Sequence, residues 1–558
     1  MDDIAEKFDS VNMHRTHSNL SNLEKNCSQI FVKGPALTKD FFDKIQTDMV
    51  PSKTDLFGYR MNTRRFLFLT GLVLLFTFSA LGTVIMWFTK VYQQSINNMM
   101  TITEDSLAFD MWRAPSPRPY MKFFIFNYTN VEDYERRSAK KLHVEEAGPY
   151  VYEEQLERVN VRFNGDGTVS YQEKRTYKFI PELSKGSPHD LVTVPNVPVI
   201  AGAAVARNWN FFMRLSYSGL LKSLNEKPFI TLTANSLIVG YEDHLYDIAK
   251  NYLKLQEKRV FDHVGLLVWK EGVQPDVITV NTGTRDYGKL GRIEKFNGQD
   301  HLDLWSSDTC NRLKISDGTV YPVDQVKSKK ELHFFLPQLC RALTLKFVEE
   351  SQVLDRVPVY KYTFPVDIFD NADQNGDHRC YCEKGSDSCG TRGVFNASAC
   401  VWGAPIYYSW PYFYNADPQL RAAISGLKRN PAKPEVYVNI HPKLGVLTGG
   451  KVKFQVNIQM QKSYGISELN NYKDGQILPI VLIESGLDEK DLPRNVIELI
   501  YRATFTVRNL ELGLKYGFLL ASTVTLACIL LVLKKRREIR LRANSIGYLR
   551  TGRHVTSL

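Results

Sequence analysis

Two long apolar segments constrain this chain more than any other feature of its sequence. They run from Phe66 to Phe88 and from Tyr516 to Leu533, and neither contains a charged residue. A helix needs about 20 apolar residues to cross the roughly 30 Å hydrocarbon core of a bilayer. Both segments are therefore predicted to be transmembrane helices, in preference to buried core helices.

Positive charge beside these segments predicts their orientation. Arg64 and Arg65 precede the first segment, and the sequence KKRREIRLR follows the second at 534–542. Because Lys and Arg beside a span stay on the cytoplasmic side, both tails are predicted to be cytoplasmic. The first segment is longer than the apolar region of a cleaved signal peptide, so we expect it to remain as a signal anchor.

This topology divides the chain into five parts. They are a cytoplasmic tail (1–65), a transmembrane helix (66–88), a lumenal or extracellular domain (89–515), a second transmembrane helix (516–533) and a basic cytoplasmic tail (534–558). The formal net charge is +11, and the last tail alone holds eight Lys and Arg against one acidic residue. Such a cluster suits anionic lipid at the inner leaflet, so the basic composition gives no reason to expect nucleic-acid binding.

Six of the eight cysteines fall in the large domain. An even number of cysteines on the oxidising side of a membrane predicts disulfide bonds. Zinc binding is disfavoured because Cys380 and Cys382 are too close in sequence for the usual ligand spacing, and His378 is the only nearby imidazole. Spacing alone does not choose the pairing, although Cys382 and Cys389 suit a local loop.

Two Asn-x-Ser/Thr sequons in the large domain, at Asn127 and Asn396, are predicted glycosylation sites. Two further sequons, at Asn19 and Asn26, lie in the tail that is predicted to be cytoplasmic. Glycosylation of Asn26 would therefore contradict the predicted orientation.

Alternation of apolar and polar residues is the commonest pattern in the large domain and predicts antiparallel strands with one buried face. It is clear over 452–460, whereas 159–171 predicts two strands joined by a Gly-rich turn. The pattern favours a large antiparallel barrel or sandwich with helical insertions.

One predicted insertion is a helix from Ala204 to Leu224. Its residues at three- and four-residue steps form an apolar stripe: Val205, Trp209, Phe212, Met213, Tyr217, Leu220 and Leu224. Arg207, Arg214 and Lys222 share another face. This helix either packs on the core with a solvated basic face or presents a ligand-binding surface; Phe211 and Leu215, off the stripe, indicate further exposed apolar surface.

The sequence offers little for catalysis. No nucleophile elbow, zinc-binding HExxH or P-loop occurs in it, so we expect neither an enzyme nor a bound cofactor. The segment 371–383 resembles the start of a calcium loop, but Cys382 stands where a bidentate Glu is required. A polar turn is therefore expected there instead of a metal site.

Several sequence blocks, in order, resemble the class B scavenger receptors, a family of lipid and lipoprotein receptors. The blocks are FNYTNVEDY (126–134), EEAGPYVYEE (145–154), VGYEDHL (239–245), NTGTRDYGKLGRIEKFNGQDHLDLW (281–305), SDGTVYP (316–322) and GAPIYYSWPYFYNADP (403–418). The resemblance covers nearly the whole chain outside the tails. It departs from the family in its long N-terminal tail, in His244, where the family has Pro, and in its small number of sequons.

The resemblance implies an α+β fold in which an antiparallel β-barrel carries an apical helical bundle and an apolar tunnel. It also implies the disulfides Cys310–Cys380, Cys340–Cys400 and Cys382–Cys389. Ligands bind at the apical bundle of this family, so the candidate contacts in the helix 204–224 are Arg207, Phe211, Phe212, Arg214, Leu215 and Lys222. The expected function is to bind lipids, fatty acids, sterols or lipoprotein particles and to pass lipid through the tunnel to the membrane.

Two other functions fit the same topology. A receptor for adhesion, phagocytosis or protein escort would bind a protein ligand at the apex, whereas a two-span ion channel would need more polar positions in its spans. No clear sorting signal chooses between the plasma membrane and the endosome or lysosome. The C-terminal sequence VTSL, through Thr556 and Leu558, suits a PDZ-type groove that captures a terminal carboxylate.

Overall fold

The computed structural model describes residues 53–56, 59–89, 91–255, 260–370, 380–382 and 390–551. Several sequence predictions fall outside these residues: most of the N-terminal tail, most of the loop 371–383, Cys389 and the C-terminal VTSL. The chain forms two compact units, Met1–Thr89 with Gly513–Leu558, and Lys90–Leu512.

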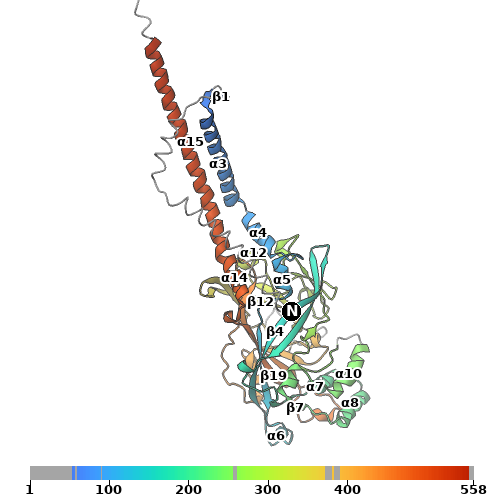
Figure 1. The fold of residues 1–558 in the computed structure, drawn as a ribbon. Coiled ribbons are helices and arrows are strands. Elements are labelled where there is room, and N and C mark those ends of the chain that lie inside the picture. The colour runs from blue at the N-terminus through green and yellow to red at the C-terminus, as the bar shows by residue number, and fades with distance from the viewer. Residues whose placement is uncertain are drawn as a thin grey trace, which may run out of the picture. The chain divides into compact units, whose positions relative to one another are not determined.

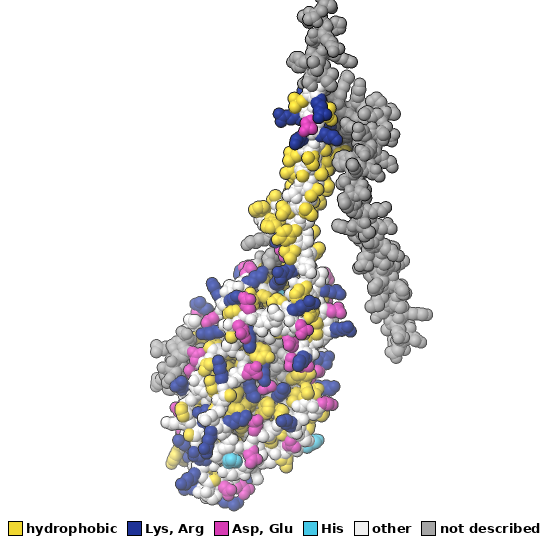
Figure 2. Space-filling model, turned by 90° about the vertical axis from the view of Figure 1, so that its left-hand side faces the viewer, with side chains coloured by type: hydrophobic (Ala, Val, Ile, Leu, Met, Phe, Trp, Pro, Cys, Tyr) yellow, Lys and Arg dark blue, Asp and Glu magenta, His cyan; other side chains and the backbone are white. Residues whose placement is uncertain are grey.

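The first unit contains two helices that are long and apolar enough to cross a membrane. They are α3 (Thr63–Phe88) and, from Gly513 onward, α15 (Val507–Thr551), and a short hairpin of β1 (Lys53–Leu56) and β2 (Tyr59–Asn62) precedes α3. The rings of Phe78 and Phe518 lie 5.9 Å apart. Apolar side chains along both helices stay exposed, among them Leu74 at 63% and Leu531 at 66%, as expected of surfaces that face lipid. Figure 2 shows these apolar side chains in yellow and, beyond them along the helix, a cluster of Lys and Arg in dark blue.

The second unit is built on one large, mostly antiparallel sheet (Figure 1). Its main path runs β10-β9-β5-β4-β3-β19-β18-β17-β13-β12-β11, and β8, β14, β15 and β16 pair beside this path. β6 and β7 form a separate two-stranded sheet. Isolated bridges join Ser316 to Arg292, next to β10, and to Phe334 in β11, so one residue links the two ends of the strand order.

The strands and helices of this unit have the following bounds. The strands are β3 (Tyr120–Tyr128), β4 (Leu142–Asn164), β5 (Thr168–Phe179), β6 (Leu191–Pro195), β7 (Phe229–Thr233), β8 (Gly272–Val273), β9 (Ile278–Asn281), β10 (Ile293–Phe296), β11 (Leu332–Leu336), β12 (Arg341–Val353), β13 (Val357–Thr363), β14 (Val394–Asn396), β15 (Ile406–Ser409), β16 (Ile424–Ser425), β17 (Tyr437–Ile440), β18 (Leu447–Gln459) and β19 (Ile477–Leu487). The helices are α4 (Val91–Met100), α5 (Leu107–Arg113), α6 (Val131–Glu135), α7 (Val197–Ala206), α8 (Phe211–Ser223), α9 (Ala234–Val239), α10 (His244–Leu255), α11 (Asp308–Asn311), α12 (Val323–Lys327), α13 (Pro418–Ala422) and α14 (Arg494–Tyr501). Within this unit, α7, α8 and α10 gather at the end opposite to α14 (Figure 1).

The structure agrees with the strand pattern in one place and corrects it in another. The predicted hairpin is confirmed, because β4 and β5 form an antiparallel pair in which Asn164 lies opposite Thr168 next to the turn. The expectation of a half-buried strand over 452–460 is wrong for its second half, where Gln455 and Asn457 are fully buried. β18 lies between β15 and β19 there. The two amides are satisfied by hydrogen bonds, since Gln455 accepts from the backbone N–H of Tyr412 at 2.7 Å and Asn457 donates to Ser409 at 3.1 Å.

Two disulfides staple the second half of this unit. They join Cys310 to Cys380 and Cys340 to Cys400, with Cα atoms 5.6 and 5.7 Å apart, and are the pairs that the family resemblance implies. Cys382 is also disulfide-bonded. The indole of the fully buried Trp305 donates a hydrogen bond of 2.7 Å to the carbonyl of Cys340, which ties one disulfide to the core.

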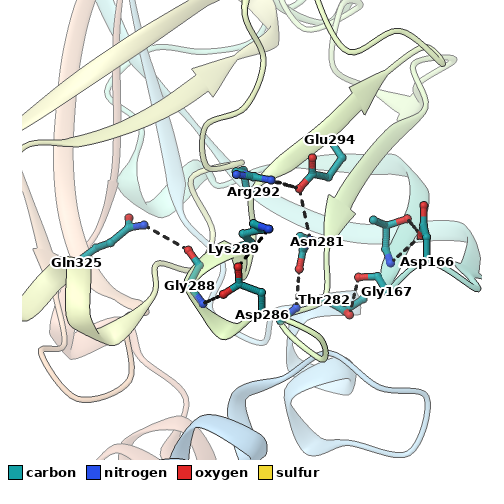
Figure 3. A network of polar contacts seen from close by, with 12 residues as sticks. Asp166, Gly167, Asn281, Thr282, Asp286, Gly288, Lys289, Arg292, Glu294 and Gln325 are labelled. Atoms are coloured by element: carbon teal, nitrogen blue, oxygen red, sulfur yellow. Dashed lines mark hydrogen bonds and ion pairs between the residues drawn. The ribbon is translucent and has the colours of Figure 1, made fainter.

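The sequence block 281–305, the longest of those that carry the resemblance, forms tightly bonded loops around β10 (Figure 3). Arg292 donates to the carboxylate of Glu294 at 2.6 and 3.0 Å, and the Asn281 amide donates to the same oxygen at 3.4 Å. The hydroxyl of Thr282 donates to the carbonyl of Gly167 at 2.8 Å, joining this loop to the β4–β5 turn. These contacts give the block a role in holding the loops beside β9 and β10.

Candidate functional site

The second unit contains a cavity of about 1020 Å³ with mostly apolar walls. Strands from across the sheet contribute Phe123, Ile278, Phe334, Phe454 and Ile480, and the helices α7, α8 and α10 complete the wall. Because the lining residues come from chain segments far apart in sequence, the cavity depends on the assembled fold.

The helical wall differs from the single helix predicted over 204–224. The structure has two helices, α7 and α8, separated by a break at 207–210. The physical reason is Asn210, whose side chain accepts a hydrogen bond of 3.0 Å from the backbone N–H of Met213 and caps the start of α8. The prediction of one continuous helix is therefore wrong.

The apolar stripe continues across this break, because stripe residues on both sides of it line the same cavity. The stripe residues that line it are Val205, Trp209, Met213, Tyr217 and Leu220. The two exceptions are Phe212, which is 77% exposed, and Leu224. The stripe thus packs on the buried core, through Tyr217 and Leu224 among others, and also borders the cavity.

The outer side of α8 carries an apolar surface that we call the α8 patch, made of Phe211, Phe212, Leu215 and Tyr464. Their exposed fractions are 42%, 77%, 52% and 80%. The ring centres of Phe211 and Tyr464 lie 5.7 Å apart, and the ring planes are inclined by 33°. Exposed aromatic groups of this kind mark a surface suited to binding another apolar surface.

The three cations of this region do not form one free basic face. Arg207 pairs with Asp474 at 3.3 Å, and Lys222 lies 3.9 Å from Glu468. Arg214 is half-buried, and its Nε has no hydrogen-bond partner among the described residues. Two of the three charges are therefore partly neutralised, which weakens any electrostatic attraction they exert.

A second group of charged residues, which we call the ionic cluster, lies at the cavity wall formed by β4 and β5. Arg175 donates to the carboxylates of Glu154 and Glu173, the latter at 2.8 Å, and Tyr177 donates to Glu154 at 3.1 Å. Lys270 completes the cluster, and Glu173, Arg175 and Lys270 line the cavity.

Burial and neighbouring charges set the ionisation of this cluster. Burial alone would raise the pKa of Glu173, but Arg175 and Arg158 hold it below its usual value. Burial lowers the pKa of the Lys270 ammonium, although Glu154 lies close enough to oppose the shift. Among the described residues, the Lys270 side chain has no hydrogen bond or ion pair.

Sequence reasoning missed the ionic cluster. A signal was present, because Tyr171, Glu173, Arg175 and Tyr177 alternate along β5 and therefore share one face of the strand. Charged residues between aromatic ones on a core-facing side indicate a buried ion pair. The signal for Lys270 was weaker, since only its position after the apolar run 264–269 marks it.

The predicted glycosylation sites lie on strands. The amide oxygen of Asn127 accepts from the backbone N–H of Thr193 at 2.8 Å, and that of Asn396 accepts from Ser398 at 3.0 Å. Neither amide nitrogen has a hydrogen bond among the described residues, so the atom that would carry a glycan is uncommitted. Within the part of the chain that the structure describes, no group of three or more His, Cys, Asp or Glu could hold a metal ion.

The sequence profile of the CD36 family matches residues 69–533, which include most of the apolar segment 66–88, all of the apolar segment 516–533 and the domain between them. The chain belongs to the CD36 family. It is 31% identical to scavenger receptor class B member 1 of Mus musculus over 408 residues, which is 73% of this chain and 77% of that protein. It is 29% identical to lysosome membrane protein 2 of Rattus norvegicus over 441 residues, or 77% of this chain and 89% of that protein.

Membership of the CD36 family supports a scavenger receptor that binds lipids or lipoproteins in general. Scavenger receptors of the CD36 family are generally receptors without enzymatic activity. The two apolar helices of this chain fit a CD36-family membrane protein with two spans and a large β-rich ectodomain.

Proposed function

We propose that this protein captures lipids or lipoprotein particles at the end of the ectodomain formed by α7, α8 and α10, and passes the lipid chain through the cavity toward the membrane. The observation that carries the proposal is the cavity of about 1020 Å³, whose wall includes the inner side of α8 while the outer side of α8 carries the exposed α8 patch. Here the cavity is part of the tunnel, and α7, α8 and α10 are the apical bundle.

Burial of the chain supplies most of the affinity in this proposal. At roughly 0.8 kcal/mol for each buried CH₂, a sixteen-carbon chain gains about 12 kcal/mol on leaving water. Exposed charge pairs such as Arg207 with Asp474 contribute about 1 kcal/mol or less each. Arg207, Arg214 and Lys222 therefore act on the rate of capture, through their long-range attraction for anionic particles.

The proposed topology places both tails in the cytoplasm and the domain 89–515 outside it, at the plasma membrane or in the endolysosomal membrane. The bridges of Ser316 to both ends of the strand order support closure of the sheet into a barrel. Surface biotinylation of intact cells tests this placement. If the protein is at the plasma membrane, the reagent should label the domain 89–515 directly. If it is in the endolysosomal membrane, labelling should require endocytic uptake of the reagent.

Lipid extraction tests the function itself. Mass spectrometry of organic extracts from the purified full-length protein should detect lipid in near-stoichiometric amounts. A preparation without lipid that also takes up no added hexadecanol would overturn the proposal. That result would favour a receptor for adhesion or protein escort whose ligand binds the α8 patch alone.

A further inference from the structure

The lysines of the cavity wall differ in their partners. Lys270 and Lys453 both line the cavity. Lys453 pairs with Glu484 at 3.3 Å and lies 4.9 Å from the ring of Phe124. Lys270 has neither an ion pair nor a side-chain hydrogen bond among the described residues, so its three N–H donors are available to a ligand.

The carboxylates of Glu154 and Glu173 attract the Lys270 ammonium electrostatically, but neither forms a hydrogen bond or an ion pair with it in the structure. Both Glu154 and Glu173 are bonded to Arg175, and Glu154 also accepts a hydrogen bond from Tyr177. An ammonium in such surroundings is costly unless an anion or an acceptor reaches it. The chain provides that acceptor from none of the residues described, whereas the cavity leaves room for one from a ligand.

We propose that Lys270 forms the headgroup subsite of this cavity, where it binds the carboxylate of a single-chain lipid whose hydrocarbon lies along the apolar wall. This inference rests on the proposed function, because it assumes that the cavity takes up lipid. One ammonium matches one carboxylate. The charges of Glu154 and Glu173 already equal those of Arg175 and Lys270 in number, so what the ligand carboxylate supplies is the close acceptor that Lys270 lacks among the described residues.

The neighbouring wall suits such a ligand. Leu266, Leu267 and Trp269 line the cavity beside Lys270 and offer apolar contacts to the first part of a chain. A charge-assisted hydrogen bond is roughly twice as strong as a neutral one, and it is strongest away from water. The subsite therefore favours a fatty acid over an alcohol or an ester of the same length.

Three probes of equal chain length test this specificity: hexadecanoic acid, hexadecanol and methyl hexadecanoate. Binding of each is measured on the purified full-length protein at neutral pH, for the wild type and for Lys270→Met, Lys270→Arg and Lys453→Met. Lys453→Met is the matched control, because it removes a lysine from the same cavity while Glu484 keeps Lys122 at 3.3 Å and Lys451 at 3.7 Å.

We expect the wild type to prefer the acid, and Lys270→Met to weaken acid binding about tenfold, which corresponds to ~1.4 kcal/mol, with binding of the alcohol and the ester unchanged. Lys270→Arg should retain the preference, and Lys453→Met should leave the ratio of acid to alcohol affinity as in the wild type. Equal affinity of the wild type for all three probes overturns the subsite, and so does an equal loss of acid binding in Lys270→Met and Lys453→Met.

These outcomes separate the subsite from the proposed function. If the wild type binds all three probes equally, the cavity takes up lipid and only the subsite fails. If the wild type binds none of them, both proposals fail. Should Lys270→Met not fold, the ratio of acid to methyl ester affinity in the wild type decides the question, because the ester has nearly the same shape and no charge.

Discussion

Replacement of Ala249 by Trp narrows the cavity from the side of α10. Ala249 lines the cavity and is half-buried, so its side chain points to space that a larger group can occupy. If the indole displaces four methylenes of a bound chain, the lost burial is about 3 kcal/mol at roughly 0.8 kcal/mol for each CH₂. Binding of hexadecanol should then weaken about 200-fold.

The matched control places the same ring on the outside of the same helix. Asn251 lies two residues further along α10, is exposed and does not line the cavity. Asn251→Trp should bind hexadecanol as the wild type does. Overpacking typically costs roughly 1 to 3 kcal/mol of stability. Thermal unfolding of both variants checks whether the extra ring has destabilised the fold by this amount.

Capture of particles provides the second readout. The α8 patch is unaltered in Ala249→Trp, so binding of anionic vesicles to cells that display this variant should match the wild type while delivery of their lipid falls. Wild-type affinity for hexadecanol in Ala249→Trp would refute the assignment of the lipid chain to this cavity. An equal loss in Asn251→Trp would show that the effect arises from α10 and not from the cavity.

Three further predictions follow from other parts of the molecule. Cys400→Ser removes a disulfide and should cost roughly 2 to 4 kcal/mol, causing retention in the secretory pathway; a normal level of the variant with mature glycans would contradict this. Reversal of Arg207, Arg214 and Lys222 to Glu should slow the association of anionic vesicles more than it speeds their release, and an unchanged rate and salt dependence would leave this region without a role in capture. Burial lowers the pKa of His441 from 6.5 to about 4, so the unfolded chain binds this proton first and stability should fall by ~1.4 kcal/mol per unit as the pH drops from about 6.5 to 4. The melting temperature of His441→Gln should decline less over this range, whereas equal slopes for variant and wild type would assign the pH dependence to other groups.

The sequence predicted those features that depend on local pattern. The apolar segments 66–88 and 516–533 lie in the helices α3 and α15, and the turn after Asn164 joins β4 to β5. Both depend on residues that are neighbours in the chain. The two described disulfide pairs came from the family resemblance, because spacing alone left the pairing open.

The break between α7 and α8 could not be predicted from periodicity. Trp209 lies outside regular helix yet still lines the cavity, so the apolar spacing continues through the break. Asn210, an effective N-cap residue, was the available sign of a new helix. The pattern indicated which residues face inward but not where the backbone stops being helical.

The cavity and its ionic cluster depend on contacts between distant segments. Lys270 becomes a candidate only when Glu154, Glu173 and Arg175 are placed beside it and are seen to bond one another. Single-sequence patterns describe the face of one strand or helix. They do not state which buried charges already have partners.

The thin helical wall formed by α8 has a thermodynamic consequence. One helix of 13 residues provides Met213, Tyr217 and Leu220 to the cavity and Phe212 and Leu215 to the exterior. A shift of this helix that reshapes one side necessarily reshapes the other. If a lipid in the cavity stabilises one position of α8, it changes the affinity of the outer surface for particles by some factor. Thermodynamic reciprocity then requires a particle bound to the outer surface to change the affinity of the cavity for lipid by the same factor. Binding of lipid in the cavity and binding of particles outside would then both report on a single equilibrium between positions of α8.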